Sequence, residues 1–344
     1  MKSIENDIAN GNIKNIYLLM GVEPYLINQF RDKLVDALVG KEDEINYKKL
    51  TGSDFITTEM IEFADTIPFF AEHRVVVVEN SGVFKTADDK LAEYFSKVPE
   101  SSYLIFTECF MGDKSDEKKY EKHLVDKRLK IYKSLNANGR IVEFPRQKDE
   151  VLNKWINTRL QAKGFSSSYS TRDKLLEYTG NDMMTILNEI EKLMCYKLEE
   201  KVIETDDVEV LCSKSIENDI FEMVAAIAAK NKRKALALYY DLLQLKESPI
   251  KILYLISREF NLLMQVKSLK KEGVGDNKIS STTGVNPYFI GKYVNISNRL
   301  SDEYLREAIG ECLDFEHAFK RGGIDPTIGV ELLIVKYSTV AGQT

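Results

Sequence analysis

Residues 64–80, ADTIPFFAEHRVVVVEN, decide the fold that we expect for the first part of the chain. Four consecutive valines between Arg74 and Glu79 predict a strand buried on both faces, because β-branched runs without polar alternation are typical of the middle of a parallel sheet. Pro68 lies shortly before this strand. Since proline lacks a backbone donor and restricts the residue before it, the helix expected over residues 57–64 should end here.

Two adjacent phenylalanines, Phe69 and Phe70, stand at this break between helix and strand. Neighbouring side chains diverge on a helix and point to opposite faces on a strand, so the two rings are hard to bury together. An exposed aromatic pair at such a junction is a candidate anchor for the pocket of a partner protein. The alternative is that both rings pack on the end of the sheet, since aromatic residues belong more often to cores than to sites.

Length and composition indicate a soluble globular protein of two or three domains, at roughly 150 residues per domain for 344 residues. The net charge of −6 gives no overall basic signature for nucleic acid. Four dispersed cysteines and three scattered histidines argue against a disulfide framework or a metal centre, and they fit a reducing cytosol. We expect no signal peptide, because residues 1–13 are polar and mixed in charge, and no membrane span, because no apolar run approaches about 18 residues.

The turn after the first expected strand lacks the residues of a nucleotide-binding P-loop. Residues 15–20, NIYLLM, predict a buried strand, Gly21 ends it, and Pro24 suits the first turn of a helix. A P-loop needs glycines whose backbone amides cradle phosphates, and a lysine that neutralises them. This turn has one glycine, no lysine and Glu23, whose charge would repel a phosphate. We therefore expect no binding or hydrolysis of ATP here.

The pattern of expected elements divides the chain into three parts. Buried strands that alternate with helices predict an α/β domain with a largely parallel sheet over residues 1–146. Residues 147–214 follow a polar hinge and show helical periodicity without a convincing strand, which predicts a small helical domain. Residues 215–344 carry long amphipathic stretches and predict an all-helical bundle. The expected strands cover residues 15–20, 74–79, 103–107 and 139–144, with a shorter possible one at 47–50.

Two basic segments are candidates for contact with nucleic acid. Residues 114–140 hold nine Lys or Arg against four Asp or Glu, and their apolar positions predict a helix with a basic outer face. An ordinary solvated helix face is the alternative. Lys320 and Arg321 precede two glycines in a basic turn, which can equally be a helix C-cap. No carboxylate pair, Ser/His/Asp set or Cys/His pair has a recognisable catalytic context, so we do not expect an enzyme.

The order of several motifs resembles the delta subunit of the bacterial DNA polymerase III clamp loader. No single motif is specific, but the ordered set spans essentially the full chain. The motifs are Gly-x-Glu-Pro-Tyr-Leu at 21–26, Pro-Phe-Phe-x-x-x-Arg-Val-Val-Val-Val-Glu-Asn at 68–80, Asn-Glu-Ile-Glu-Lys-Leu at 188–193 and Ile-Phe at 220–221. The resemblance implies an AAA+-like module, made of a parallel α/β sheet domain and a small helical lid domain, followed by an all-helical collar domain.

The resemblance also implies a function, that of a non-hydrolysing subunit that binds and opens the ring-shaped DNA sliding clamp for loading onto primed DNA. The family's clamp-binding element maps onto Pro68, Phe69 and Phe70. The implied partners are the sliding clamp, delta prime and the clamp-loader ATPase subunits, with primed DNA inside the complex and Lys320 and Arg321 as possible contacts. No cofactor and no membrane are implied, and the expected location is the cytoplasmic, nucleoid-associated replisome.

Two other interpretations stay open from the residues. A delta-prime-like stator, or another inactive AAA+ scaffold, shares the architecture. Delta prime tends to keep a zinc-binding cysteine cluster and a Ser-Arg-Cys motif, whereas here Cys212 precedes Ser213 and Lys214. A nucleotidyl-transfer or nuclease enzyme with an unrecognised site would show metal-dependent turnover on primed DNA. The strand at 75–80 ends in Glu-Asn where active relatives carry Asp-Glu, which supports a loss of hydrolysis.

Overall fold

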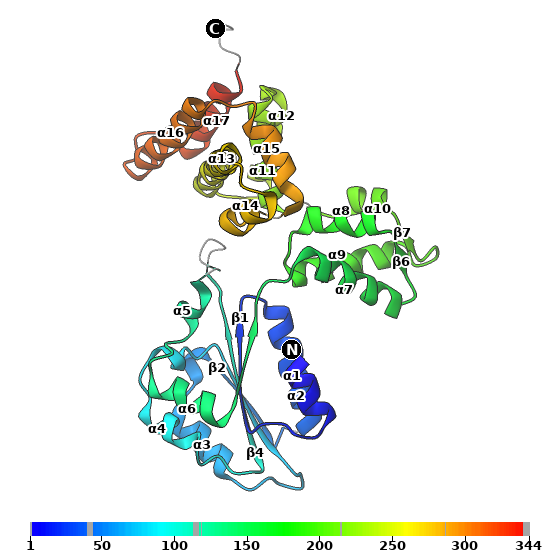
Figure 1. Ribbon diagram of the computed structural model, residues 1–344, viewed down its shortest axis with the longest axis vertical. Helices are drawn as coiled ribbons and strands as arrows, with labels where there is room; N and C mark the ends of the chain where they lie inside the picture. Colours follow the sequence, from blue (N-terminus) through cyan, green and yellow to red (C-terminus); the bar gives the residue numbers. More distant parts are fainter. Residues whose placement is uncertain are drawn as a thin grey trace. The chain divides into compact units, whose positions relative to one another are not determined.

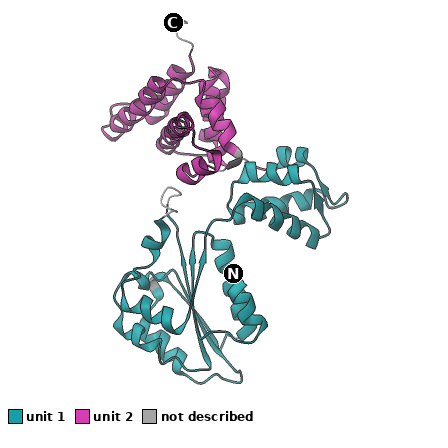
Figure 2. Cartoon of the chain, in the orientation of Figure 1, with its two compact units in different colours: residues 1–211 teal, residues 212–344 magenta. Residues whose placement is uncertain are grey.

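The computed structural model describes residues 2–39, 44–112, 117, 119–213, 215–285 and 287–339. The chain forms two compact units, residues 1–211 and residues 212–344 (Figure 2). The finer division expected within the first unit, at residues 146 and 147, stays a prediction.

The first unit is built on a five-stranded sheet with the order β2-β3-β4-β1-β5, in which every pair of neighbouring strands is parallel (Figure 1). The four valines lie in β3, between β2 and β4, and all four are buried, as predicted. The fold class expected from the sequence, α/β plus α, is confirmed. The strands are β1 (Ile16–Gly21), β2 (Tyr47–Thr51), β3 (Arg74–Glu79), β4 (Ser102–Cys109) and β5 (Arg140–Phe144).

Helices cover both faces of this sheet, with α1 and α2 on one face and α3, α4 and α6 on the other (Figure 1). Alternate residues of β1 serve the two layers, because side chains alternate across a strand. Leu18 joins the core beneath α3, α4 and α6, whereas the Tyr17 hydroxyl donates to Asp7 of α1 at 2.7 Å. The helices are α1 (Lys2–Ala9), α2 (Pro24–Leu38), α3 (Thr57–Asp65), α4 (Asp89–Tyr94), α5 (Tyr120–Leu124) and α6 (Lys130–Asn138).

The basic segment contains two short helices, α5 and α6, where the sequence predicted one. Between them Val125 has an extended backbone and ends α5. The Asp126 carboxylate accepts a hydrogen bond from the backbone N–H of Arg128 at 2.9 Å, and it also pairs with the Arg128 guanidinium. Such a local side-chain-to-backbone bond competes with helical hydrogen bonding, which explains the interruption.

The rest of the first unit is mainly helical. The expectation that it holds no strand was wrong, because β6 (Ser166–Ser167) and β7 (Val202–Ile203) form a short parallel pair. Two residues are too few to show an alternating pattern, so no periodicity signal precedes them. The helices of this part are α7 (Asp149–Ala162), α8 (Tyr169–Thr179), α9 (Met183–Tyr196) and α10 (Thr205–Leu211).

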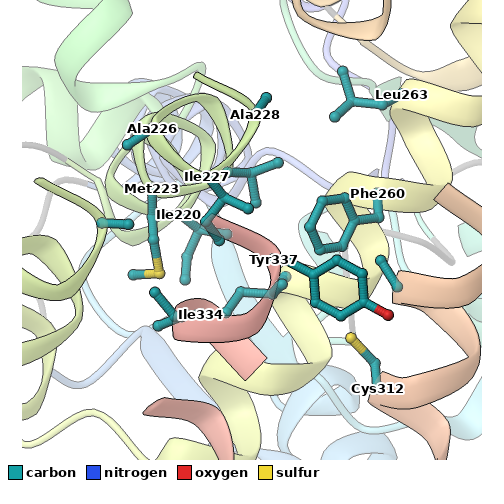
Figure 3. Packing of buried hydrophobic residues seen from close by; sticks show 14 of the residues in the cluster. Ile220, Met223, Ala226, Ile227, Ala228, Phe260, Leu263, Cys312, Ile334 and Tyr337 are labelled. Atoms are coloured by element: carbon teal, nitrogen blue, oxygen red, sulfur yellow. The ribbon is translucent and has the colours of Figure 1, made fainter. Parts of the chain in front are cut away.

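All the regular elements that the structure describes in the second unit are helices, as predicted. The long helix α13 packs against α11, α14, α15, α16 and α17. In its core the ring of Phe260 lies beside that of Tyr337, with centroids 6.3 Å apart (Figure 3). The helices are α11 (Ile216–Ala228), α12 (Lys232–Gln244), α13 (Pro249–Lys271), α14 (Asp276–Thr283), α15 (Pro287–Ser297), α16 (Asp302–Lys320) and α17 (Pro326–Ser338).

Candidate functional site

The aromatic pair singled out in the sequence projects from the loop between α3 and β3, at the amino edge of the sheet. Phe69 is 56% exposed, Phe70 is 96% exposed and Ile67 is 84% exposed, whereas Pro68 is half-buried. The two phenyl rings make an edge-to-face contact, with centroids 4.5 Å apart. Both rings therefore stay clear of the end of the sheet. An apolar cluster of this kind on a loop is typical of a protein-binding surface.

The backbone of this loop is held by side chains that are themselves buried. Asn46, which is only 2% exposed, accepts a hydrogen bond from the N–H of Phe69 at 2.8 Å and donates one to its carbonyl at 2.9 Å. Arg74 donates to the carbonyl of Ile67 at 3.1 Å. Phe70 has a φ of +54°, in the left-handed region that non-glycine residues rarely adopt. The structure around the loop thus imposes its conformation.

The helix that leads into the loop is also anchored. At its end, the Ser102 hydroxyl donates to the carbonyl of Ala64 at 2.5 Å, and the Tyr94 hydroxyl donates to the Asp65 carboxylate at 2.6 Å. The guanidinium of Arg74 lies over the Phe63 ring, 4.5 Å from its centroid. The aromatic pair is therefore carried by a loop with a rigid base, which is the arrangement that precise binding needs.

At the opposite, carboxyl edge of the sheet, the place of a P-loop is taken by a buried carboxylate. Gly21 ends β1 against β5, so closely that a Cβ atom there would lie 2.2 Å from the carbonyl oxygen of Phe144. Glu23 then stands at the N-cap of α2, where its side chain is fully buried and does not cap the helix. Burial raises the pKa of the Glu23 carboxyl to about 7. A carboxylate at a helix N-terminus occupies the position where a phosphate would otherwise be held.

Arg146 completes this ion-pair cluster. Its guanidinium contacts Glu23 at 3.0 Å, Glu117 at 3.0 Å and Asp182 at 3.4 Å. Asp182 is the N-cap of α9, so the cluster links the sheet to the small helical part of the same unit. Next to it, the rings of Tyr25 and Trp155 make an edge-to-face contact at 5.3 Å. Opposite charges and aromatic packing therefore fill this edge of the sheet.

The polar end of β3 is engaged in contacts within the fold. Glu79 pairs with Lys49 at 2.9 Å and with Arg31. The Asn80 side chain accepts a hydrogen bond from the backbone N–H of Cys109 at 2.8 Å. These residues tie β3 to its neighbours, which gives each of them a structural role.

The basic candidates lie elsewhere in the chain. Lys320, at the end of α16, pairs with Glu316 at 2.6 Å. The glycines after Arg321 donate back to the last turn of the helix, from Gly322 to Phe319 and from Gly323 to Ala318, which is a Schellman cap. The turn is therefore a C-cap, and its contact with DNA stays a prediction.

Of the basic segment 114–140, residues 114–116 and 118 lie outside the described residues. Four of the basic side chains that are described pair with acidic ones: Lys127 with Glu121, Arg128 with Asp126, Lys130 with Asp89 and Arg140 with Asp7. Such pairing favours a solvated helix face. Contact between this segment and DNA remains a hypothesis.

The described residues contain no group of three or more His, Cys, Asp or Glu side chains arranged to hold a metal ion. In the same part of the chain, no helix is both long and apolar enough to span a membrane. None of the four cysteines, all of which lie in the described part of the chain, forms a disulfide.

Sequence reasoning missed two residues that shape these sites, Asn46 and Arg146. A single asparagine before a short strand and a single arginine in a hinge carry no local pattern. Their contacts reach 23 and 123 residues along the chain, so only the fold brings the partners together.

Two family models match the chain in sequence order. Residues 17–144 match the model described as DNA polymerase III, delta subunit, and residues 217–337 match DNA polymerase III delta subunit, C-terminal domain. The first match contains the aromatic loop and the P-loop position, and the second covers most of the helical second unit.

Individual relatives agree with these matches. The DNA polymerase III subunit delta of Bacillus subtilis (strain 168) is 25% identical over 339 residues, which are 96% of this chain and 94% of that protein. The probable DNA polymerase III subunit delta of Aquifex aeolicus (strain VF5) is 26% identical over 287 residues, 80% of this chain and 77% of that protein. Among solved structures, the Bacillus subtilis DNA clamp loader delta protein has the same fold, with a TM-score of 0.62 and 23% identity over 98% of this chain and 99% of that one.

Proposed function

Since the chain belongs to the DNA polymerase III delta-subunit family, which is a component of the clamp loader, we propose that it binds the ring-shaped DNA sliding clamp and opens it. The observation that carries this proposal is the exposed pair Phe69 and Phe70 on a rigidly held loop. Pro68, which is half-buried, sets the course of the chain into the pair.

The two rings enter an apolar pocket on the clamp surface. Buried aromatic anchors are typical hot spots, and each of these rings contributes ~2 kcal/mol or more to binding. Binding opens the ring only as far as the chain prefers the clamp conformation with one loosened subunit interface. The difference between its affinities for the open and the closed clamp sets how far this subunit can shift the clamp toward the open state.

This chain neither binds nor hydrolyses ATP in our proposal. The buried Glu23 at the N-terminus of α2 and its pairing with Arg146 support this, because they put negative charge and a side-chain cluster where phosphates would lie. ATP is then bound by the partner ATPase subunits of the loader. No cofactor is needed by this chain.

The remaining partners follow from the family. Residues 215–344 act as the collar that joins delta prime and the ATPase subunits, and primed DNA lies inside the assembled complex. Lys320, which is exposed, and Arg321 are candidate contacts to that DNA. The complex works at the replisome, in the cytoplasm.

The test is binding of the purified chain to the sliding clamp of the same organism, with the double variant Phe69→Ala/Phe70→Ala. We expect a micromolar or tighter complex that weakens at least ~100-fold in the variant, since two hot spots are lost. The matched control is Tyr169→Ala/Tyr196→Ala, which removes two rings that are each 58% exposed but lie in the small helical part. Unchanged binding by the Phe69/Phe70 variant, with its fold intact by circular dichroism, would refute the anchor.

A further inference from the structure

We infer that Asn46 is a positioning residue for clamp binding, which holds the aromatic pair in its binding arrangement without touching the clamp. The inference rests on the proposed function, since it concerns the same loop. It adds a residue from a different part of the chain, immediately before β2, that no sequence motif points to.

The side chain of Asn46 makes the hydrogen bonds that the backbone of a neighbouring strand would otherwise make. Its side-chain amide makes two hydrogen bonds with one residue, Phe69, and so satisfies both the N–H and the carbonyl as a neighbouring strand would. Its own backbone carbonyl accepts from the N–H of Val75 at 2.8 Å. Asn46 therefore connects the loop to the first residues of β3 and is fixed at both ends.

The conformation that Asn46 holds is one that a free loop would rarely adopt. Phe70 has a φ of +54°, and left-handed backbone is unfavourable for a residue with a Cβ atom. The ring of Phe70 is almost fully exposed, so packing within this chain does not compensate. A strained residue of this kind persists only where its surroundings impose it, and such residues gather at functional sites.

Asn46 supports the aromatic loop from a buried position, where it cannot contact the clamp. Its side chain is 2% exposed, so a partner docking on the rings cannot reach it. Arg74 helps from the other side, through its hydrogen bond to the carbonyl of Ile67. The loop is thus ordered before it meets the clamp, which lowers the conformational entropy lost on binding.

The experiment measures clamp binding by the full chain carrying Asn46→Ala, together with hydrogen exchange of the loop amides in the absence of clamp. We expect the affinity to fall about tenfold, because the loop must then be ordered during binding. We also expect the Phe69 amide to exchange at least about tenfold faster, since its acceptor is gone. The exchange experiment needs no clamp and reports on the loop alone.

Asn15→Ala is the matched control. Asn15 also lies at the amino edge of the sheet, and its side chain donates to the carbonyls of Glu100 at 3.0 Å and Ser102 at 2.9 Å. Its backbone carbonyl accepts from Leu104, as that of Asn46 accepts from Val75. Asn15→Ala removes comparable hydrogen bonds from a different loop, so it should leave clamp affinity within about twofold of the wild type. An equal loss in both variants would show a general effect on stability and overturn the inference.

The failures of the two proposals differ. If Asn46→Ala binds like the wild type while Phe69→Ala/Phe70→Ala does not bind, the inference is wrong and the anchor stands. If the double phenylalanine variant binds normally, the proposed function of this loop fails, and the positioning role fails with it. Should Asn46→Ala not fold, Asn46→Ser takes its place, because serine is polar but too short to reach both backbone groups of Phe69, and the same losses are expected.

Discussion

The guanidinium of Arg146 donates a hydrogen bond of 3.0 Å to the carboxylate of Glu23, across 123 residues of sequence. The contact lies at the carboxyl edge of the sheet, where a nucleotide is bound in many α/β folds. Glu117 and Asp182 share the same guanidinium, so three carboxylates surround one cation. The second carboxylate oxygen of Glu23 has no hydrogen-bond partner among the described residues. These conditions make Glu23 a titrating group of the folded chain.

The Glu23 carboxyl makes the stability of the chain depend on pH. Its pKa rises from 4.5 to about 7 on folding, mainly through burial, so the folded state holds the proton more tightly than the unfolded state. Its stabilising contribution is complete below pH 4.5 and is lost as the pH rises through 7. The side chain of Glu23→Gln stays neutral at every pH. As the pH rises from 4.5 to 8, the free energy of unfolding of this variant should therefore increase by up to about 3 kcal/mol relative to that of the wild type. Urea unfolding at both pH values measures this difference.

Glu72→Gln is the control, since the Glu72 side chain is 94% exposed. Its free energy of unfolding should follow that of the wild type across the same pH range. A constant difference between Glu23→Gln and the wild type from pH 4.5 to 8 would contradict the role assigned to Glu23.

Removal of Arg146 should have the opposite effect to removal of the Glu23 charge. Arg146→Ala leaves Glu23, Glu117 and Asp182 without their shared cation, and a carboxylate left buried and unpaired is costly. We expect the free energy of unfolding to fall by about 3 kcal/mol at pH 8. The decrease should be smaller at pH 5, because Glu23 takes up a proton there. Chemical unfolding at the two pH values tests this. Arg128→Ala, which removes an exposed arginine from Asp126, should change little at either pH.

Replacing Phe70 by glycine should make the chain more stable and should weaken its binding to the clamp. Phe70→Gly relieves a left-handed backbone and removes a ring that is 96% exposed, so the free energy of unfolding should rise by up to about 1 kcal/mol. The same substitution removes a proposed clamp anchor, so clamp binding should weaken at least ~10-fold. Thermal unfolding and a binding titration on one sample measure both.

Lys201→Gly is the companion variant, because Lys201 has a φ of +55° and lies outside the aromatic loop. It should give a similar stabilisation with clamp binding unchanged. Wild-type affinity in Phe70→Gly would remove Phe70 from the proposed anchor.

Substitution by alanine should destabilise the chain at one glycine and stabilise it at another. In Gly21→Ala the new Cβ would lie 2.2 Å from the carbonyl oxygen of Phe144, which is backbone and cannot move aside. We expect a loss of about 2–3 kcal/mol, since β1 and β5 must separate. Gly310 lies inside α16 with nothing within 4 Å of a new Cβ atom, so Gly310→Ala should gain up to about 1 kcal/mol. Urea unfolding of both variants measures the two changes in the free energy of unfolding. Changes of the same sign would refute the steric argument.

Much of the fold could be predicted because its signals are local. The valine run before Glu79, the apolar segment before Gly21 and the break at Pro68 each depend on a few neighbouring residues. Those residues form buried strands and end a helix in the structure, as expected. The prediction failed where the signal was too short, as in β6 and β7, or where one side chain interrupts a helix, as Asp126 does.

The aromatic pair was visible in the sequence, but its exposure was not. Adjacent rings at a break are consistent with a core as well as with a site, and only the structure places both Phe69 and Phe70 outside the sheet. The hydrogen bonds from Asn46 and the left-handed backbone of Phe70 had no signal at all, because each depends on a loop packed against a distant strand.

The sequence by itself determined the five strands of the main sheet, most of the helices and the lack of P-loop residues at Gly21 to Pro24, because these depend on side-chain type and on spacing within a few residues. Only the tertiary structure decided that Asn46 supports Phe69 and that Arg146 neutralises Glu23. The physical reason is that parallel strands joined by helical crossovers bring together residues far apart in sequence. A hydrogen bond or ion pair between two such residues leaves no periodic trace along the chain.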